Sequence, residues 1–302
     1  MIIVSGASGA FGRQAAELLI EAVDPDQLIL TSRTPQKLID LAERGAQVRY
    51  ADFDDPSSLE TAFAGGTRML LISTARVGSR VGQHINAMTA AVKVGVRHIA
   101  YTSLLGVAKD GNPAIVKRDH LATEQALELC GAAWTFLRDS QYAEAIAGAM
   151  APGAVATGRL PDNSTGGRIA FVSRDDCVAV AAAVLRQEGH ENKAYDLTGP
   201  EIWTVERAMA LVSELSGKPI IVEPVDDEGM FRHFDSLGIP RHASDEVIPG
   251  AIPWCSEDMV TFGQSIREGY FDSQTDHVER ITGRPAKGLR EVMMAFKDSW
   301  PA

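Results

Sequence analysis

Residues Met1–Gly12 read MIIVSGASGAFG, and this stretch predicts a buried strand that runs directly into a glycine-rich turn. The run Met1–Val4 is apolar, too short for a helix, and ended at once by a serine and a glycine. Three glycines then follow at intervals of three residues, and apolar residues continue with helical spacing as far as Ile20. The predicted order is therefore strand, turn and helix.

A helix that begins just after a strand directs unpaired N–H groups and a partial positive charge at the turn before it. Such a turn suits a pyrophosphate, because glycines permit positive φ and leave the backbone open to a ligand. The spacing G-x-x-G-x-x-G departs from the G-x-G-x-x-G of the common dinucleotide fingerprint, and a helix-packing turn without a ligand is the alternative. The residues expected to contact a dinucleotide here are Gly6, Ser8, Gly9, Ala10, Phe11 and Gly12.

The composition is that of a globular protein with a sizeable core: 302 residues, 45% of them hydrophobic and 23% charged. A formal net charge of −11 disfavours binding to nucleic acid or to an anionic membrane. No signal peptide or membrane-spanning run is recognised, and Cys130, Cys177 and Cys255 lack the spacing of a disulfide framework or a zinc site. We therefore expect a cytoplasmic protein with free thiols and no metal.

Apolar runs alternate with helical patterns along the first half of the chain. Strands are predicted at residues 1–4, 27–31, 46–50, 68–73, 98–102 and 133–138, and helices near 10–22, 35–44, 83–94 and 117–130. This alternation predicts an α/β fold with a doubly wound parallel sheet, whose ligand crevice lies at the carboxyl ends of the strands. Residues 1–150 are expected to form this domain, and residues 151–302 a smaller substrate-binding part with some segments returning to the core.

The residues after the second predicted strand favour NADP over NAD. The NAD fingerprint has an acidic residue here for the ribose 2′-hydroxyl, and this chain has none. Ser32, Arg33 and Lys37 offer instead a hydroxyl and two cations suited to a 2′-phosphate. The alternative is that Arg33 is only a solvated loop cation.

Polar residues also follow the next three strands. Asp52 and Phe53 are suited to contact an adenine ring, although the acidic run also indicates a helix N-cap, at Asp55. The fourth and fifth strands are followed by Ser73, Thr74 and Ser103. All of these residues are expected at the same edge of the sheet as the glycine turn.

Several segments together resemble the NmrA-like group of atypical short-chain dehydrogenase/reductases, and within it the branch of triphenylmethane reductase and NAD(P)H:quinone oxidoreductase. The segments are GASGAFG, TSR, ADFDDPSSL, AVKVGVRHIAYTS, HLATEQAL and AAWTFLRDSQYAE, which span roughly Met1–Glu144, with fainter agreement beyond. The resemblance implies a Rossmann fold with a smaller C-terminal part and a bound dinucleotide, usually NADPH.

The chain lacks the Tyr-x-x-x-Lys pair with which typical short-chain dehydrogenases protonate a carbonyl, since none of its five tyrosines has a lysine four residues on. The predicted helix at 117–130 carries His120, which either acts on the nicotinamide ribose or substrate, or is a structural histidine paired with Glu124. Lys117 and Arg118 are alternative sources of positive charge. Tyr142 matches a tyrosine of the family that either orients a substrate carbonyl or forms a pocket wall.

The candidate catalytic residues are thus His120, Tyr142 and Ser103. Asp139 stands where the family commonly has asparagine. Without a Tyr-Lys pair, we expect hydride transfer governed by positioning, toward an acceptor whose product is delocalised, such as a quinone, enone, aromatic ketone or dye.

The second half of the chain is expected to wall the nicotinamide and to select the substrate. A loop-rich crossing is predicted from Met150 to Gly167, followed by a strand at 167–173 and a helix at 174–187. Helices are also predicted at 203–215 and 226–237, a strand at 219–225, and turns at Pro249–Trp254. The predicted function is an NADPH-dependent reductase, monomeric or homodimeric. The alternative is an NADP-sensing regulator without turnover.

Overall fold

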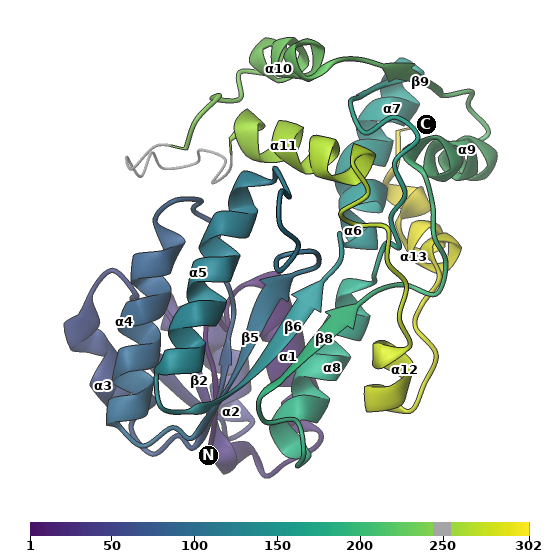
Figure 1. The fold of residues 1–302 in the computed structure, drawn as a ribbon. Coiled ribbons are helices and arrows are strands. Elements are labelled where there is room, and N and C mark those ends of the chain that lie inside the picture. The colour runs from purple at the N-terminus through teal and green to yellow at the C-terminus, as the bar shows by residue number, and fades with distance from the viewer. Residues whose placement is uncertain (244–254, 302) are drawn as a thin grey trace.

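The protein is described by a computed structural model over residues 1–243 and 255–301. Its main feature is a seven-stranded sheet in the order β3-β2-β1-β4-β5-β6-β8, in which every neighbouring pair is parallel (Figure 1). The strands are β1 Ile2–Val4, β2 Leu28–Ser32, β3 Gln47–Tyr50, β4 Arg68–Leu71, β5 His98–Leu104, β6 Ala133–Asp139 and β8 Lys193–Leu197. The first six lie within two residues of their predicted bounds, and the doubly wound α/β fold is confirmed.

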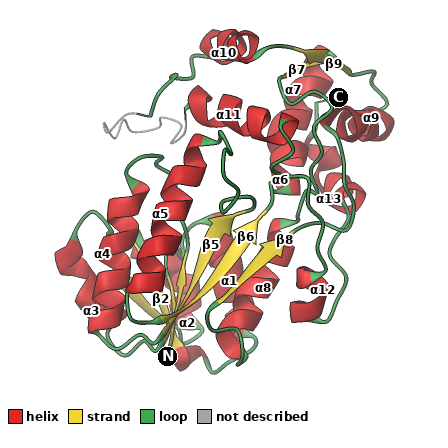
Figure 2. Ribbon diagram, in the orientation of Figure 1, coloured by secondary structure: helices red, strands yellow, loops and turns green. Residues whose placement is uncertain are grey.

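Helices cover the sheet on both faces (Figure 2). Its apolar side chains alternate between the two layers of helices, so all strands except the edge strands β3 and β8 are largely buried. Along β1, Ile2 and Val4 pack with α1, α8 and α12, whereas Ile3 packs with α3, α4 and α5. The helices around the sheet are α1 Ala10–Ile20, α2 Ile39–Glu43, α3 Leu59–Phe63, α4 Arg80–Lys93, α5 Ile115–Leu129, α8 Arg174–Arg186 and α12 His277–Thr282.

The strand order reverses between β1 and β4, which are neighbours in the sheet although two strands separate them in sequence. In such sheets ligands bind beyond the carboxyl ends of the strands at this switch point. We call the line of these strand ends the carboxyl edge. The glycine turn after β1 and the loop after β4 both lie there.

A smaller part of the molecule lies beyond the carboxyl edge (Figure 1). It contains a two-stranded parallel sheet, β7 Arg159–Asp162 with β9 Ile221–Pro224, and a hydrophobic core that also includes residues at the end of β5 and the start of α5. Its helical elements are α6 Ala143–Ala145, a π-helical turn Ile146–Met150, α7 Ala151–Thr157, α9 Val205–Ser216, α10 Asp227–Ser236, α11 Ser256–Arg267 and α13 Leu289–Phe296. β8 is a strand of the main sheet, and α8 packs on that sheet. The domain boundary at residue 150 stays a prediction.

Several predicted elements differ from the structure. The segment predicted as a helix at 35–44 is helical, but it begins as a 3-10 turn, Pro35–Leu38, before the short α2. The strand at 167–173 is absent from the described structure, because only Ile169 and Val172 form isolated bridges there. The crossing expected as loop contains α7 and β7, and β8 was not predicted at all. The turns at Pro249–Trp254 lie outside the described residues.

Across residues 1–243 and 255–301, none of the helices combines the length and the apolar character needed to cross a lipid bilayer.

Candidate active site

The glycine turn joins β1 to α1 with a backbone that suits glycine. Gly6 has a φ of +58°, in the left-handed region, and a Cβ added there would meet no atom within 4 Å. Gly12, in the first turn of α1, packs so closely that an added Cβ would lie 2.5 Å from the carbonyl oxygen of Gly6. The turn therefore holds α1 against the end of β1 and leaves open space above Gly6.

The N-terminus of α1 has no side chain to satisfy its N–H groups. Its N-cap is Gly9, which provides no capping side chain, and its first turn contains no acidic residue. By contrast, Ser173 and Thr204 accept hydrogen bonds from the N–H groups of α8 and α9. The uncapped N–H groups and the positive end of the helix dipole suit this turn to a phosphate.

Hydroxyl groups connect the glycine turn to the loop after β2. Ser8 Oγ and Ser32 Oγ lie 2.7 Å apart, and the N–H of Thr34 donates to Ser32 Oγ at 2.9 Å. Arg33 and Lys37 project from the same loop and are exposed. Neither side chain makes a hydrogen bond or ion pair with any residue that the structure describes. Two unneutralised cations thus stand beside the glycine turn.

Asp52 lies after β3, in the turn that precedes α3. Its carboxylate accepts a hydrogen bond from a backbone N–H two residues on, at 3.1 Å. Phe53 is half-buried, and its carbonyl accepts from Asn86 of α4 at 2.9 Å. The predicted cap at Asp55 is confirmed, because its carboxylate accepts from the N–H of Ser57 at the start of a 3-10 turn.

The loop after β4 is held by β5 and α4. The N–H of Ser73 donates to Thr102 Oγ1 at 2.8 Å, and the hydroxyl of Thr74 donates to Gln83 at 2.6 Å. The N–H of Thr74 donates to Nε2 of the buried His84 at 3.1 Å. Burial and the nearby Arg80 lower the pKa of His84 to about 3, so this ring is neutral and accepts at Nε2. The Thr74 hydroxyl is therefore directed at α4.

His120 is buried, with both ring nitrogens bonded to protein groups. Its Nδ1 lies 2.8 Å from Tyr101 Oη, and its Nε2 lies 3.1 Å from Arg80 Nη1. Because a guanidinium only donates, Nε2 accepts, and the ring proton is on Nδ1, directed at Tyr101. Burial and the Arg80 charge lower the pKa of His120 well below its usual value. The neutral ring therefore has no free proton to give to a substrate.

Glu124 binds residues of the sheet, so the expected pair with His120 is wrong. Its two carboxylate oxygens accept from Arg138 of β6, at 3.0 Å from Nε and 2.7 Å from Nη2. The buried Ser103 hydroxyl also donates to Glu124, at 2.6 Å. The proton of Ser103 thus points into the protein. The two cations considered as alternatives to His120 are engaged or directed elsewhere: Lys117 Nζ donates to a backbone carbonyl, and Arg118 is exposed.

Tyr142 presents its ring, and not its hydroxyl, between the glycine turn and α8. Its Oη donates to Oδ2 of the buried Asp139 at 2.7 Å. Burial raises the pKa of Asp139 to about 7, although hydrogen bonds from Tyr142 and the Cys177 thiol lower it. The Tyr142 ring centroid lies 6.5 Å from that of Phe11 and 5.9 Å from the guanidinium carbon of Arg174. This arrangement favours the pocket wall among the two roles considered for Tyr142.

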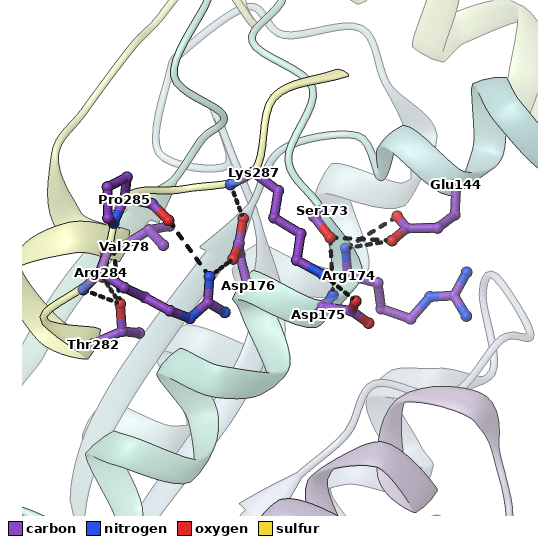
Figure 3. Close-up of polar contacts among 10 residues, drawn as sticks. All are labelled: Glu144, Ser173, Arg174, Asp175, Asp176, Val278, Thr282, Arg284, Pro285 and Lys287. Carbon is purple, nitrogen blue, oxygen red and sulfur yellow. Dashed lines mark hydrogen bonds and ion pairs between the residues drawn. The ribbon is translucent and has the colours of Figure 1, made fainter. Parts of the chain in front are cut away.

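A late segment of the chain closes over the start of α8 (Figure 3). Asp176 is fully buried and accepts from Arg284 Nη1 and from the N–H of Lys287, each at 2.7 Å. The Lys287 ammonium also pairs with Asp175 at 2.8 Å. These contacts fasten residues 284–287 to a helix of the main sheet.

The sequence analysis missed Arg174, which begins α8 at the carboxyl edge. Its backbone N–H donates to both carboxylate oxygens of Glu144 at 3.0 Å, and Ser173 Oγ donates to the same carboxylate at 3.2 Å. The available signal was a serine followed by Arg-Asp-Asp, since serine caps helices and acidic residues favour the first turn.

Comparison with known proteins identifies the family of this chain. The model of a family described as NAD(P)H-binding matches residues 6–188. Quinone oxidoreductase 2 of Escherichia coli is 36% identical over 291 residues, which cover 96% of each chain.

Two solved structures share the fold over nearly their whole length. The NADPH complex of the Escherichia coli quinone oxidoreductase superposes with a TM-score of 0.89 at 31% identity, covering 98% of this chain and 99% of the other. The NADP(H) complex of Citrobacter sp. triphenylmethane reductase gives a TM-score of 0.85 at 30% identity, covering 97% and 99%. These matches confirm the resemblance found in the sequence, and the chain belongs to the NAD(P)H-binding family.

Proposed function

We propose that this NADPH-dependent reductase transfers a hydride to a conjugated or aromatic acceptor, such as a quinone, an enone, an aromatic ketone or a dye. The proposal rests on one observation: the three predicted proton donors, His120, Ser103 and Tyr142, all direct their polar hydrogens at other buried side chains. An isolated ketone needs a positioned acid, whereas a conjugated acceptor spreads the new negative charge over its own atoms and takes its proton from water.

The phosphates of the dinucleotide fit the glycine turn and the loop after β2. The uncapped N-terminus of α1, with open space above Gly6, accommodates the pyrophosphate. Arg33 and Lys37 are free to bind a 2′-phosphate. Arg13, the other nearby cation, is neutralised by Glu17 and Asp40. Ser8 and Ser32 fix the distance between the two phosphate sites.

The remaining predicted contacts follow the next two strands. We assign Asp52 and Phe53 to the adenine, and Ser73 and the Thr74 backbone to the ribose on the nicotinamide side. Bound NADPH supplies the hydride. The protein's task is then to hold the acceptor flat against the nicotinamide, with the Tyr142 ring as one wall.

We assign His120 a positioning role. It fixes Arg80, whose Nη2 donates to the carbonyl oxygen of Ala75 at 3.1 Å in the loop after β4. The loop that borders the nicotinamide is thus anchored to α5 through Arg80 and His120.

The test is NADPH oxidation with a panel of menadione, an enone, an aryl ketone and malachite green. We expect turnover with menadione, and slow or no turnover with cyclohexanone, an isolated ketone measured beside the panel. Tight NADPH binding without turnover of any acceptor would overturn the proposal and leave the alternative, an NADP-sensing regulator.

A further inference from the structure

Arg174 carries a guanidinium that no carboxylate neutralises. The residue is half-buried, yet its side chain makes no hydrogen bond or ion pair with residues 1–243 or 255–301. Figure 3 shows the side chain extending away from the pair of Asp175 and Lys287, with no polar contact at its guanidinium. The guanidinium lies over the ring of Tyr142, whose centroid is 5.9 Å from the guanidinium carbon.

The acidic side chains around the start of α8 are occupied by other donors. Glu144 accepts from the Arg174 backbone and from Ser173, as described above. Asp175 accepts from Lys287 and, at 3.1 Å, from Gln14 of α1. Asp176 is held by Arg284 and the Lys287 backbone, and Asp139 by Tyr142. None of these carboxylates bonds to the Arg174 side chain in the described structure.

The electrostatics of this position favour an added anion. Arg174 is the first residue of α8, where the helix dipole is positive and a cation is unfavourable. The hydrogen bond from Gln14 to Asp175 holds the start of α8 beside α1, whose own uncapped N-terminus is also positive. The Tyr142 ring lies between Phe11 at the glycine turn, with the two rings tilted relative to each other, and the guanidinium of Arg174. An oxyanion at the carboxyl edge would meet positive groups from both helices.

We propose that Arg174 binds an oxyanion at the carboxyl edge, as a further binding residue of the reductase. The proposal rests on the proposed function only where it names the anionic acceptor as the ligand. A planar guanidinium presents several donors to two oxygens at once, which matches phosphate, sulfonate, carboxylate or phenolate groups. The dinucleotide pyrophosphate and an anionic acceptor share this chemistry, and equilibrium binding separates them.

The experiment compares wild type, Arg174→Gln and Arg186→Gln. Arg186 is the matched control because it is an exposed arginine at the other end of the same helix. The first measurement is the Kd of NADPH by fluorescence titration. The second is the Kd of naphthoquinone sulfonate and of neutral menadione, for the enzyme saturated with NADP⁺. We expect Arg174→Gln to raise the NADPH or the sulfonate Kd on the order of tenfold, and menadione binding to change far less.

A change in the NADPH Kd alone assigns Arg174 to the pyrophosphate, and a change in the sulfonate Kd alone assigns it to the acceptor. Arg174→Lys keeps the positive charge without the planar guanidinium and should show a smaller change in Kd. This variant replaces Arg174→Gln if the glutamine variant is too unstable to titrate. The proposal is overturned if a folded variant keeps wild-type values of both constants. Because neither constant requires turnover, a protein that reduces no acceptor would refute the proposed function and still decide the role of Arg174.

Discussion

Replacing Asp139 with asparagine should make the stability of the protein depend less on pH. Asp139 is 5% exposed, accepts a hydrogen bond from Tyr142 at 2.7 Å, and has no ion-pair partner among residues 1–243 and 255–301. Burial raises the pKa of its carboxyl from the ordinary 3.8 to about 7. Folding therefore favours the protonated carboxyl, and asparagine resembles that form in shape and neutrality.

Between these two pKa values the folded protein keeps a proton that the unfolded chain has released. The free energy of unfolding therefore falls as the pH rises through this interval, by about 1.4 kcal/mol per pH unit. Over the whole interval the free energy of unfolding falls by at most about 4 kcal/mol. Between about pH 5 and about pH 8 it falls by at most about 3 kcal/mol, because the decrease ends near the raised pKa. Relaxation of the protein around the new charge makes the measured value smaller.

The assay is urea unfolding of the wild type and of Asp139→Asn at about pH 5 and about pH 8, with slopes and midpoints compared. Other titrating groups, such as His84, are present in both proteins and cancel in the difference. The variant should gain stability relative to wild type at the higher pH, whereas Asp110→Asn, at an exposed carboxyl, should not. The reasoning fails if wild type and Asp139→Asn show the same pH dependence within about 0.5 kcal/mol.

Three further substitutions test the site. Arg33→Ala should weaken NADPH binding by about 1.5–3 kcal/mol and NADH binding far less, because only NADPH has a 2′-phosphate; equal losses in fluorescence titrations would contradict this role. Gly12→Ala should destabilise the protein by about 1–3 kcal/mol and weaken NADPH binding, since its Cβ meets the carbonyl of Gly6; wild-type melting and affinity would show that the turn adjusts. His120→Ala should lower the free energy of unfolding by about 2 kcal/mol without changing the shape of the pH profile of kcat. If the variant loses the limb of that profile near neutral pH, His120 is a proton donor.

The main sheet was predictable because its strands are local apolar runs. β1, β2, β4 and β5 are almost fully buried, so each appears in the sequence as a short, mainly apolar segment, whereas β3, QVRY, was found from its position between two turns. β8 was missed because KAYDL contains a lysine and an aspartate, and only its pairing with β6 makes it a strand. The apolar run at 167–173 is buried without a ladder, so hydrophobicity alone predicted the wrong element there.

The glycine turn was more predictable than the contacts of the candidate catalytic side chains. Glycine spacing and the lack of an acidic residue after β2 are local properties that the sequence displays directly. The partners of His120 and Glu124 are tertiary: the helical spacing indicated that these two residues pair, but Arg138 on a distant strand binds Glu124. The role of Arg174 depends on which neighbouring carboxylates are already occupied, and sequence order does not show this.

The contact of residues 284–287 with α8 has a consequence for how the chain acquires its structure during synthesis. Asp176 lies in the first turn of a helix that covers the main sheet, yet both of its partners are more than a hundred residues later in the chain. A nascent chain that has assembled all seven strands still holds an unpaired carboxylate in its core, which is unfavourable. The carboxylate of Asp176 gains its partners only once residues 284–287 have been synthesised, so the main sheet reaches its full stability later than the synthesis of its own strands.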